Sequence, residues 1–267
     1  MAYHFFDYKY NIPEFTSDLF CPAHLLYIGA VLILSFFITY QLRSTPHDTV
    51  RRVLKIQAVF TVLLEVCKIT WESYYDITTG RGFNWEGLLP IYTCSLLIYT
   101  LPFAAREKGF ARDCACKFLT TIGLLYGAVG VIYCNGLNYY PFWTFGAFYS
   151  LYFHASMYFT GLFLLMTGYQ KLTWRDALEA AVPVLLLSAA AIPVNYILGS
   201  DYMMIYSGSG LPLYEALAAY LAARHLRFLY TVIMMLTHIP LAILVIGAYR
   251  LAGHVFVRRR RSVRRAA

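Results

Sequence analysis

Charged residues are scarce in this chain. They make up 13% of its 267 residues, whereas about 25% is usual in a soluble domain. Hydrophobic residues make up 60%, which is more apolar side chain than one water-soluble core can bury. The composition therefore predicts a protein whose main solvent is lipid.

Two further patterns are missing. The six cysteines form no CxxC pair, so the sequence gives no sign of a zinc or dithiol redox site, and we expect neither a metal nor a cofactor. The first fifteen residues are polar, aromatic and acidic, without the basic start and apolar core of a cleavable signal peptide.

Positive charge is present but confined. The net charge is +8, and the cations lie in short hydrophilic connectors and in the arginine-rich tail Arg258–Arg265. Basic segments beside a membrane span set orientation and attract anionic lipid headgroups. The pattern thus indicates a membrane partner and not a nucleic acid.

Seven apolar runs are long enough to cross a bilayer, since a helix needs about 20 residues to span the roughly 30 Å hydrocarbon layer. No soluble segment separates these runs, and the sequence shows no internal repeat. We therefore predict an all-α polytopic bundle of about seven transmembrane helices, forming a single domain over residues 1–267 with a basic cytoplasmic tail at 250–267. The predicted spans are 23–42, 53–74, 88–105, 117–134, 143–168, 177–197 and 226–249.

The connectors between these spans carry unequal charge. Connectors 43–55, 106–117 and 169–176 hold four, four and two lysines or arginines, whereas the other side has only Lys9, Arg81 and Arg224. Because cytoplasmic connectors are enriched in lysine and arginine, this distribution predicts an outside amino terminus and a cytoplasmic carboxyl terminus, in a multi-pass protein of the cell membrane.

Ionisable side chains interrupt the second span. Glu65, Lys68 and Glu72 recur at intervals of three and four residues, so they share one face of a helix. A charge at the bilayer centre costs several kcal/mol unless it is paired or faces a polar interior. The stripe must point into the bundle, either as a self-neutralising pair that only locks helices or as part of a functional site.

His154 and His238 are expected near the midplane with Glu65, whereas Cys94 is expected about 6 residues, or about 9 Å, inside the outer end of its span. His154 and His238 each lie about 12 residues, or about 18 Å of helix, from the outer end of their spans, and Glu65 lies at a matching depth. Either histidine alone is most often a hydrogen-bonded packing residue. Cys94 follows Pro90, which suits the first turn of a helix. A lone cysteine is usually a small apolar filler, unless a nearby base converts it into a nucleophile.

A polar segment follows the sixth span. Asn195, Tyr196, Asp201 and Tyr202 precede the glycine-rich run 207–210. This order suggests a segment that folds back over the mouth of the bundle, and the alternative is an ordinary loop at the level of the lipid headgroups.

Four of these segments together resemble the YwaF-type integral membrane family of bacteria, which is similar to vertebrate transmembrane protein 164. They are the acidic residue in Leu64–Val66, the Leu-Pro-x-x-x-Cys sequence of Leu89–Cys94, His154, and Asn195–Met203, which matches Asn-Tyr-x-x-Gly-x-Asn-Tyr-Met except for Asp201. Their order and spacing cover residues from about 55 to 205.

The resemblance implies a compact helical bundle. Through the vertebrate relative it also implies acyl transfer on phospholipids, with Cys94 carrying the acyl group and membrane phospholipids, including an acyl donor lipid, as partners. Asp201 departs from the usual asparagine, Tyr92 stands where glutamine or histidine is common, and Ala222–Arg227 replaces a tryptophan-containing element. These departures bear on the substrate more than on Cys94 and His154.

Three functions remain open at this point. As a lipid-modifying enzyme, the protein would use Cys94 as nucleophile, His154 as base and Glu65 to orient the histidine. As a proton-coupled transporter or a solute- or lipid-binding protein, it would use the interior groups Glu65, Lys68, His154 and His238, with Asn195, Tyr196, Asp201 and Tyr202 at the mouth. As a non-catalytic scaffold, it would use its buried polar groups only to fix helix register.

Overall fold

The computed structural model describes residues 4–12, 15–80, 82–208 and 212–266, and all their side chains except those of Asn11 and of residues 253–266. Every regular element in these ranges is helical. The expectation of an all-α fold is therefore confirmed. In the predicted basic tail, the side chain of Arg250 lies over the ring of Trp174, whereas those of the arginines in 258–265 lie outside the described side chains and the backbone there continues the last helix.

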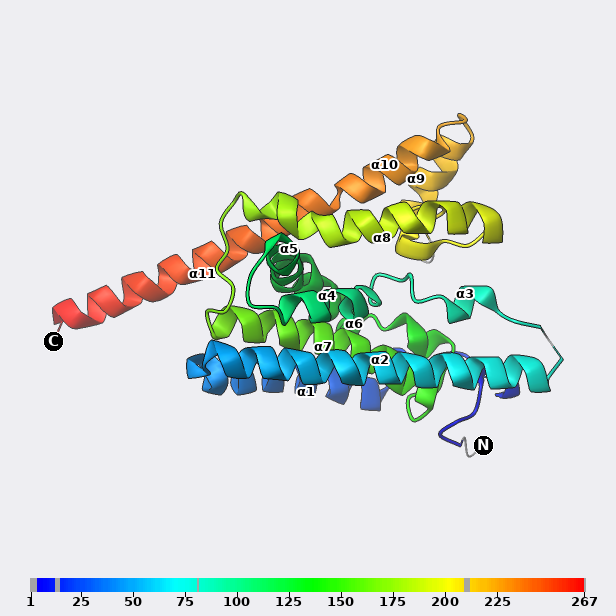
Figure 1. The fold of residues 1–267 in the computed structure, drawn as a ribbon, viewed down its shortest axis with the longest axis horizontal. Helices are drawn as coiled ribbons and strands as arrows, with labels where there is room; N and C mark the ends of the chain where they lie inside the picture. Colours follow the sequence, from blue (N-terminus) through cyan, green and yellow to red (C-terminus); the bar gives the residue numbers. More distant parts are fainter. Residues whose placement is uncertain (1–3, 13–14, 81, 209–211, 267) are drawn as a thin grey trace.

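The helices form two layers with a third group between them (Figure 1). One layer contains α1, α2, α6 and α7, and the other contains α8, α10 and α11, while α4 and α5 lie between the layers. The bounds are α1 (Pro22–Gln41), α2 (His47–Thr78), α4 (Leu96–Ala104), α5 (Phe110–Phe118), α6 (Leu124–Ile132), α7 (Phe145–Met166), α8 (Asp176–Leu198), α10 (Arg227–Leu236) and α11 (His238–Ala266).

Four helical stretches in the described ranges are long and apolar enough to cross a membrane. Two other helices, α2 and α7, are also long, but polar side chains lower their hydropathy: α2 carries the charged stripe, and α7 carries His154 and several tyrosines. A membrane protein is therefore supported, with fewer spans evident from composition than the seven predicted. The four stretches are Pro22–Ser44, Phe110–Asn138, Asp176–Leu198 and Arg227–Ala252.

The predicted continuous helix over 88–105 is wrong in its first half. The short helix α3 (Trp85–Leu88) ends there, Leu89 is extended with φ −78° and ψ 122°, and a helix resumes only at Leu96. The residue before a proline is biased towards this extended conformation, so Pro90 interrupts the helix instead of starting it. Cys94 consequently lies in an irregular turn before α4.

The connector predicted for 198–225 contains an additional helix, α9 (Pro212–Ala222), which packs against α10. The last predicted span is also divided, because α10 ends at Leu236 and α11 begins at His238. The ring of Pro240 collides with the carbonyl four residues earlier in a regular helix, and that carbonyl belongs to Leu236.

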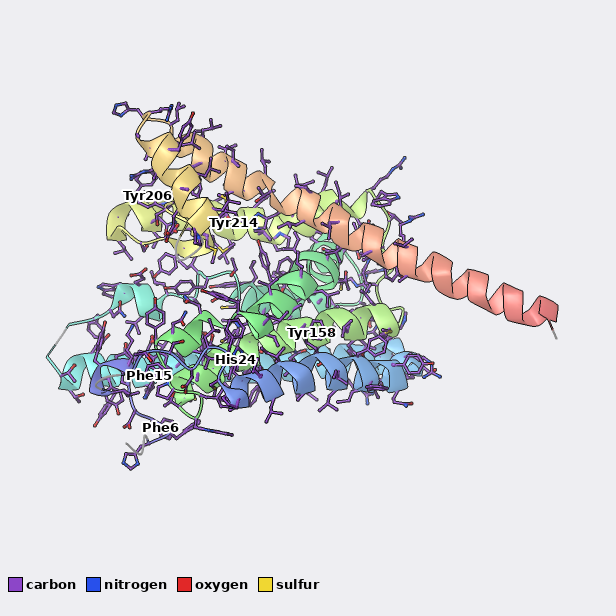
Figure 2. The ribbon with its side chains drawn as sticks, turned by 180° about the vertical axis from the view of Figure 1, so that it is seen from behind. Phe6, Phe15, His24, Tyr158, Tyr206 and Tyr214 are labelled. Atoms are coloured by element: carbon purple, nitrogen blue, oxygen red, sulfur yellow. The ribbon has the colours of Figure 1, made fainter. Side chains whose placement is uncertain are left out.

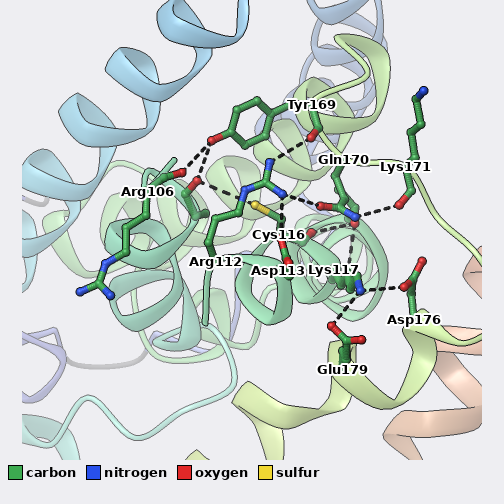
Figure 3. A network of polar contacts seen from close by, with 12 residues as sticks. Arg106, Arg112, Asp113, Cys116, Lys117, Tyr169, Gln170, Lys171, Asp176 and Glu179 are labelled. Atoms are coloured by element: carbon green, nitrogen blue, oxygen red, sulfur yellow. Dashed lines mark hydrogen bonds and ion pairs between the residues drawn. The ribbon is translucent and has the colours of Figure 1, made fainter. Parts of the chain in front are cut away.

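The three basic connectors meet at the end of the bundle from which α11 extends (Figure 1). An ion pair of 3.5 Å joins Arg51 Nη2 to Glu107 Oε1, and Arg112 Nη1 donates to Gln170 Oε1 over 3.3 Å. Lys117 Nζ lies 2.7 Å from Asp176 Oδ1 at the start of α8. Figure 3 shows how Arg112 and Lys117 tie α5 to Gln170 and to Asp176.

Candidate functional site

The charged stripe of α2 is buried inside the bundle. Glu65, Lys68 and Glu72 are each less than 10% exposed, on the face that their spacing predicts. Lys68 Nζ lies 3.5 Å from Glu65 Oε1 and 3.4 Å from Glu72 Oε2. The Lys68 ammonium group thus lies between two carboxylates, one about a helical turn before it and the other about a helical turn after it.

The stripe also holds the chain that leads to the site. Lys68 Nζ donates to the carbonyl of Gly87, and the amide of Asn84 donates to Asp76 Oδ2 over 2.8 Å. A Cβ at Gly87 would lie 3.1 Å from Glu72 Oε2, so the absence of a side chain there lets the backbone approach the stripe. Lys68 and Asp76 therefore fix the approach to the irregular turn that carries Cys94.

Tyr149 of α7 completes this cluster, and the sequence analysis missed it. Its hydroxyl donates to Glu65 Oε2, and Lys68 Nζ lies 5.6 Å from the centre of its ring. The only signal was indirect, because a carboxylate within the bilayer needs donors from neighbouring helices. With 24 tyrosines in the chain, that signal could not single out one of them.

Cys94 lies on the irregular stretch after α3, and Lys68 holds the chain before that stretch through the carbonyl of Gly87. The Cys94 side chain is partly buried and packs against the main apolar core. The structure thus brings together Glu65 and Lys68, adds Tyr149 to them, and attaches the chain before Cys94 to the same cluster.

His154 is held on a different side of α7. Its Nδ1 lies 2.8 Å from the carbonyl of Ser150, and its ring packs on Gly130 of α6. A carbonyl can only accept, so Nδ1 carries the proton and Nε2 keeps a lone pair. One helical turn before His154, Ser150 Oγ accepts from Cys134 Sγ over 3.2 Å, so this part of α7 is fixed to the chain after α6.

His238 has a local role at the break between α10 and α11. Its Nδ1 lies 3.0 Å from the carbonyl of Met235, and its ring meets Tyr126 edge to face at 5.8 Å. It is almost fully buried. These contacts are those of a hydrogen-bonded packing residue, and they do not join His238 to the cluster on α2.

The polar segment after α8 folds back on itself around Asn195. Gly199 ends the helix with φ 64°, a left-handed conformation that glycine adopts without strain. Asn195 Oδ1 then accepts from the amide of Tyr202 over 2.8 Å and from Ser200 Oγ over 3.2 Å, and Asn195 Nδ2 donates to the carbonyl of Tyr202 over 3.0 Å. One buried amide therefore fixes the whole turn.

Tyr202 joins this turn to the chain before Cys94. Its hydroxyl donates to the carbonyls of Trp85 and Glu86, over 3.1 and 2.8 Å, and its ring meets Tyr92 at 4.9 Å. Burial raises the pKa of the Tyr202 phenol, and the negative charges of Glu86 and Glu72 raise it further. The phenol therefore remains a protonated donor at neutral pH.

The other two predicted mouth residues have different surroundings. Asp201 Oδ1 accepts from the amide of Tyr206 over 2.7 Å, and Asp201 Oδ2 accepts from Ser207 Oγ over 3.0 Å. Tyr196 is 54% exposed and meets Tyr206 edge to face. Figure 2 shows Tyr206 and Tyr214 in the layer of α8 to α10, with Tyr158 and His24 in the opposite layer.

An apolar groove opens beside the end of α8. It has a volume of about 260 Å³ and is lined by Trp85, Leu89, Val194, Ile197 and Leu198. Leu89 lies five residues before Cys94 on the irregular stretch. The groove thus runs between that stretch and the end of α8. Within the described residues, no cluster of three histidine, cysteine, aspartate or glutamate side chains has the geometry to hold a metal ion.

An apolar bundle with a paired charged stripe in its interior defines an integral membrane protein of the all-α class. The chain belongs to the TMEM164 family, which it matches over residues 19–248. This finding confirms the resemblance to transmembrane protein 164 that the four sequence segments indicated. No curated protein and no solved structure matches the chain.

The three hydrogen bonds of the Asn195 amide, which we call the Asn195 clamp, can be tested directly. Asn195→Ala removes three hydrogen bonds, each worth about 1 kcal/mol, from the turn at 199–204. We expect amide hydrogen exchange at Tyr202 to become at least about 10-fold faster, measured by mass spectrometry in detergent micelles. Tyr196→Ala, on the exposed side of the same helix, is the matched control and should leave that exchange rate unchanged. Equal rates in the two variants would contradict the clamp.

Proposed function

We propose that the chain crosses the cell membrane seven times as a single transmembrane domain, with its amino terminus outside and its carboxyl terminus in the cytoplasm. The family match over 19–248 supports one domain. The meeting of the three basic connectors at the end from which α11 extends supports the orientation, since lysine and arginine concentrate on the cytoplasmic side. The interrupted stretch 89–104 counts as one span, buried by its neighbours.

The orientation predicts opposite labelling of two connectors. Tyr139→Cys lies in the 135–142 connector and Lys171→Cys in the 169–176 connector, and both positions are exposed. A membrane-impermeant maleimide added to intact cells should label position 139 and leave position 171 unlabelled until the cells are opened, as read by peptide mass spectrometry. Labelling of position 171 from outside, or of both positions equally, would contradict the proposed topology.

For the activity, we propose acyl transfer on membrane phospholipids through a thioester at Cys94. The observation that supports it most is the position of Cys94, on the irregular stretch that borders the apolar groove at Leu89 and whose preceding chain is held by Lys68 at Gly87. A thiol needs polar groups to become a nucleophile, and an acyl chain needs an apolar path from the bilayer. Polar groups and an apolar groove both border the stretch that carries Cys94.

As the sequence predicts, His154 takes the thiol proton in this proposal, and its Nε2 keeps a lone pair because Nδ1 donates to Ser150. The Glu65 carboxylate already accepts from Tyr149 and pairs with Lys68, which weakens it as a base. Its contacts are with these two groups and not with His154, so in this proposal Glu65 fixes Lys68 and Tyr149 instead of orienting the histidine.

The reaction has two balanced halves. The thiol proton passes to His154 Nε2, the thiolate attacks the ester carbonyl of a phospholipid, and the carbon–oxygen bond breaks as the lysophospholipid leaves with that proton. In the second half, the hydroxyl of an acceptor lysophospholipid attacks the thioester, and its proton passes to His154. The carbon–sulfur bond then breaks and the sulfur is protonated again.

The other two functions are supported less well. A proton or solute pathway would need His238 and the α2 stripe to be connected, whereas His238 contacts Met235 and Tyr126. A scaffold would explain the paired stripe and a packed cysteine, but it assigns no role to the apolar groove that borders the stretch before Cys94. Acyl exchange and proton flux, measured on the same vesicles, separate the three functions.

The thioester itself is the test of the activity. Purified protein is incubated with phospholipid vesicles, and an acyl adduct that hydroxylamine removes is sought by intact-protein mass spectrometry. We expect the adduct in the wild type and its loss in Cys94→Ser. His154→Ala should form it about 100-fold or more slowly, in line with the loss of a general base.

Cys67→Ser is the matched control, because Cys67 is a free and exposed cysteine on the same bundle. It should keep the adduct. Acyl exchange that persists in Cys94→Ser would overturn the assignment of the nucleophile. A proton flux that Glu65→Gln abolishes, without any acyl exchange in the wild type, would favour transport.

A further inference from the structure

Two glycines of α6 allow it to pack closely on α7. A Cβ built at Gly127 would lie 2.3 Å from the backbone nitrogen of Tyr158, and one built at Gly130 would lie 1.9 Å from Cδ2 of His154. Both distances are far below van der Waals contact, so any side chain at either position forces a neighbour to move.

The two positions differ in what would have to move. At Gly127 the three nearest atoms all belong to the backbone of α7, two from Tyr158 and one from His154. At Gly130 the three nearest atoms all belong to the imidazole of His154, with Cγ at 2.4 Å and Nε2 at 2.5 Å. A methyl group at 127 therefore pushes the helices apart, whereas one at 130 pushes the ring.

The imidazole is constrained from its other nitrogen as well. Nδ1 donates to the carbonyl of Ser150 over 2.8 Å, which sets the tautomer and limits rotation of the ring. The surface left by Gly130 then sets where the edge bearing Cδ2 and Nε2 can lie. Two contacts, one from each end of the ring, thus determine the direction of the Nε2 lone pair.

We infer that Gly130 is a positioning residue for His154. Because Gly130 has no side chain, the imidazole can occupy the orientation from which Nε2 takes up a proton. This inference rests on the proposed function, in which His154 accepts the proton of Cys94. Gly130 touches neither the lipid ester nor the thiol in this mechanism. It acts only through the histidine.

The test compares Gly130→Ala, Gly127→Ala and Gly29→Ala in the full chain. In Gly130→Ala the methyl group displaces the His154 ring. A misplacement of about 1 Å can cost about 100-fold in rate. We therefore expect thioester formation at Cys94 to slow by about 10- to 100-fold, with an unchanged KM for phospholipid vesicles. The pH dependence of that rate should also shift, because the displaced ring loses its bond to Ser150. Gly29→Ala is the control, since nothing lies within 4 Å of its built Cβ.

A second measurement detects the contact without any reaction. Gly130→Ala should lower the melting temperature in detergent, and adding His154→Ala should restore part of the loss, because the obstructing ring is gone. The same addition to Gly127→Ala should restore little, since the obstruction there is backbone.

The outcomes separate the inference from the function on which it rests. A wild-type protein that forms no thioester overturns the proposed function, and the stability coupling between Gly130 and His154 is unaffected by that result. A wild type that forms the thioester while Gly130→Ala reacts like Gly29→Ala overturns this inference alone. Absence of any stability coupling between Gly130→Ala and His154→Ala overturns it as well.

Discussion

One buried ammonium group organises this protein. Lys68 lies between the carboxylates of Glu65 and Glu72 on the face of α2 that is buried in the bundle. Removing a charge from water costs several kcal/mol, and only paired, hydrogen-bonded charges recover that cost in the interior. The pairing therefore requires α2 to turn this one face inward, and each partner of the stripe must lie where it can complete the pairing.

The pairing of Lys68 also positions the segments around Cys94. Tyr149 of α7 donates to Glu65, and the carbonyl of Gly87 accepts from Lys68, so the stripe fixes both the neighbouring helix and the chain before Cys94. Tyr202 then attaches the turn after α8 to that same chain. These contacts attach α2, α7 and the turn after α8 to the chain before Cys94, although these segments lie far apart in the sequence.

Much of this could be predicted from the sequence, for identifiable physical reasons. The spacing of Glu65, Lys68 and Glu72 gave their shared face, because helical periodicity is local. The polar run after the sixth span gave a segment that folds back, because asparagine and glycine favour such turns. The interruption before Cys94 was missed, because Pro90 fits a first helical turn as well as a break. Tyr149 and Gly130 were missed because their roles depend on contacts between helices, which no local pattern encodes.

The pairing of Lys68 is tested most directly by removing its charge alone and then together with its partners. Lys68→Met leaves two buried carboxylates without their cation, and we expect the free energy of unfolding in detergent to fall by at least about 3 kcal/mol. Adding Glu65→Gln and Glu72→Gln to Lys68→Met should recover most of that loss, since no unpaired charge remains. A Lys68→Met variant as stable as the wild type would contradict the account.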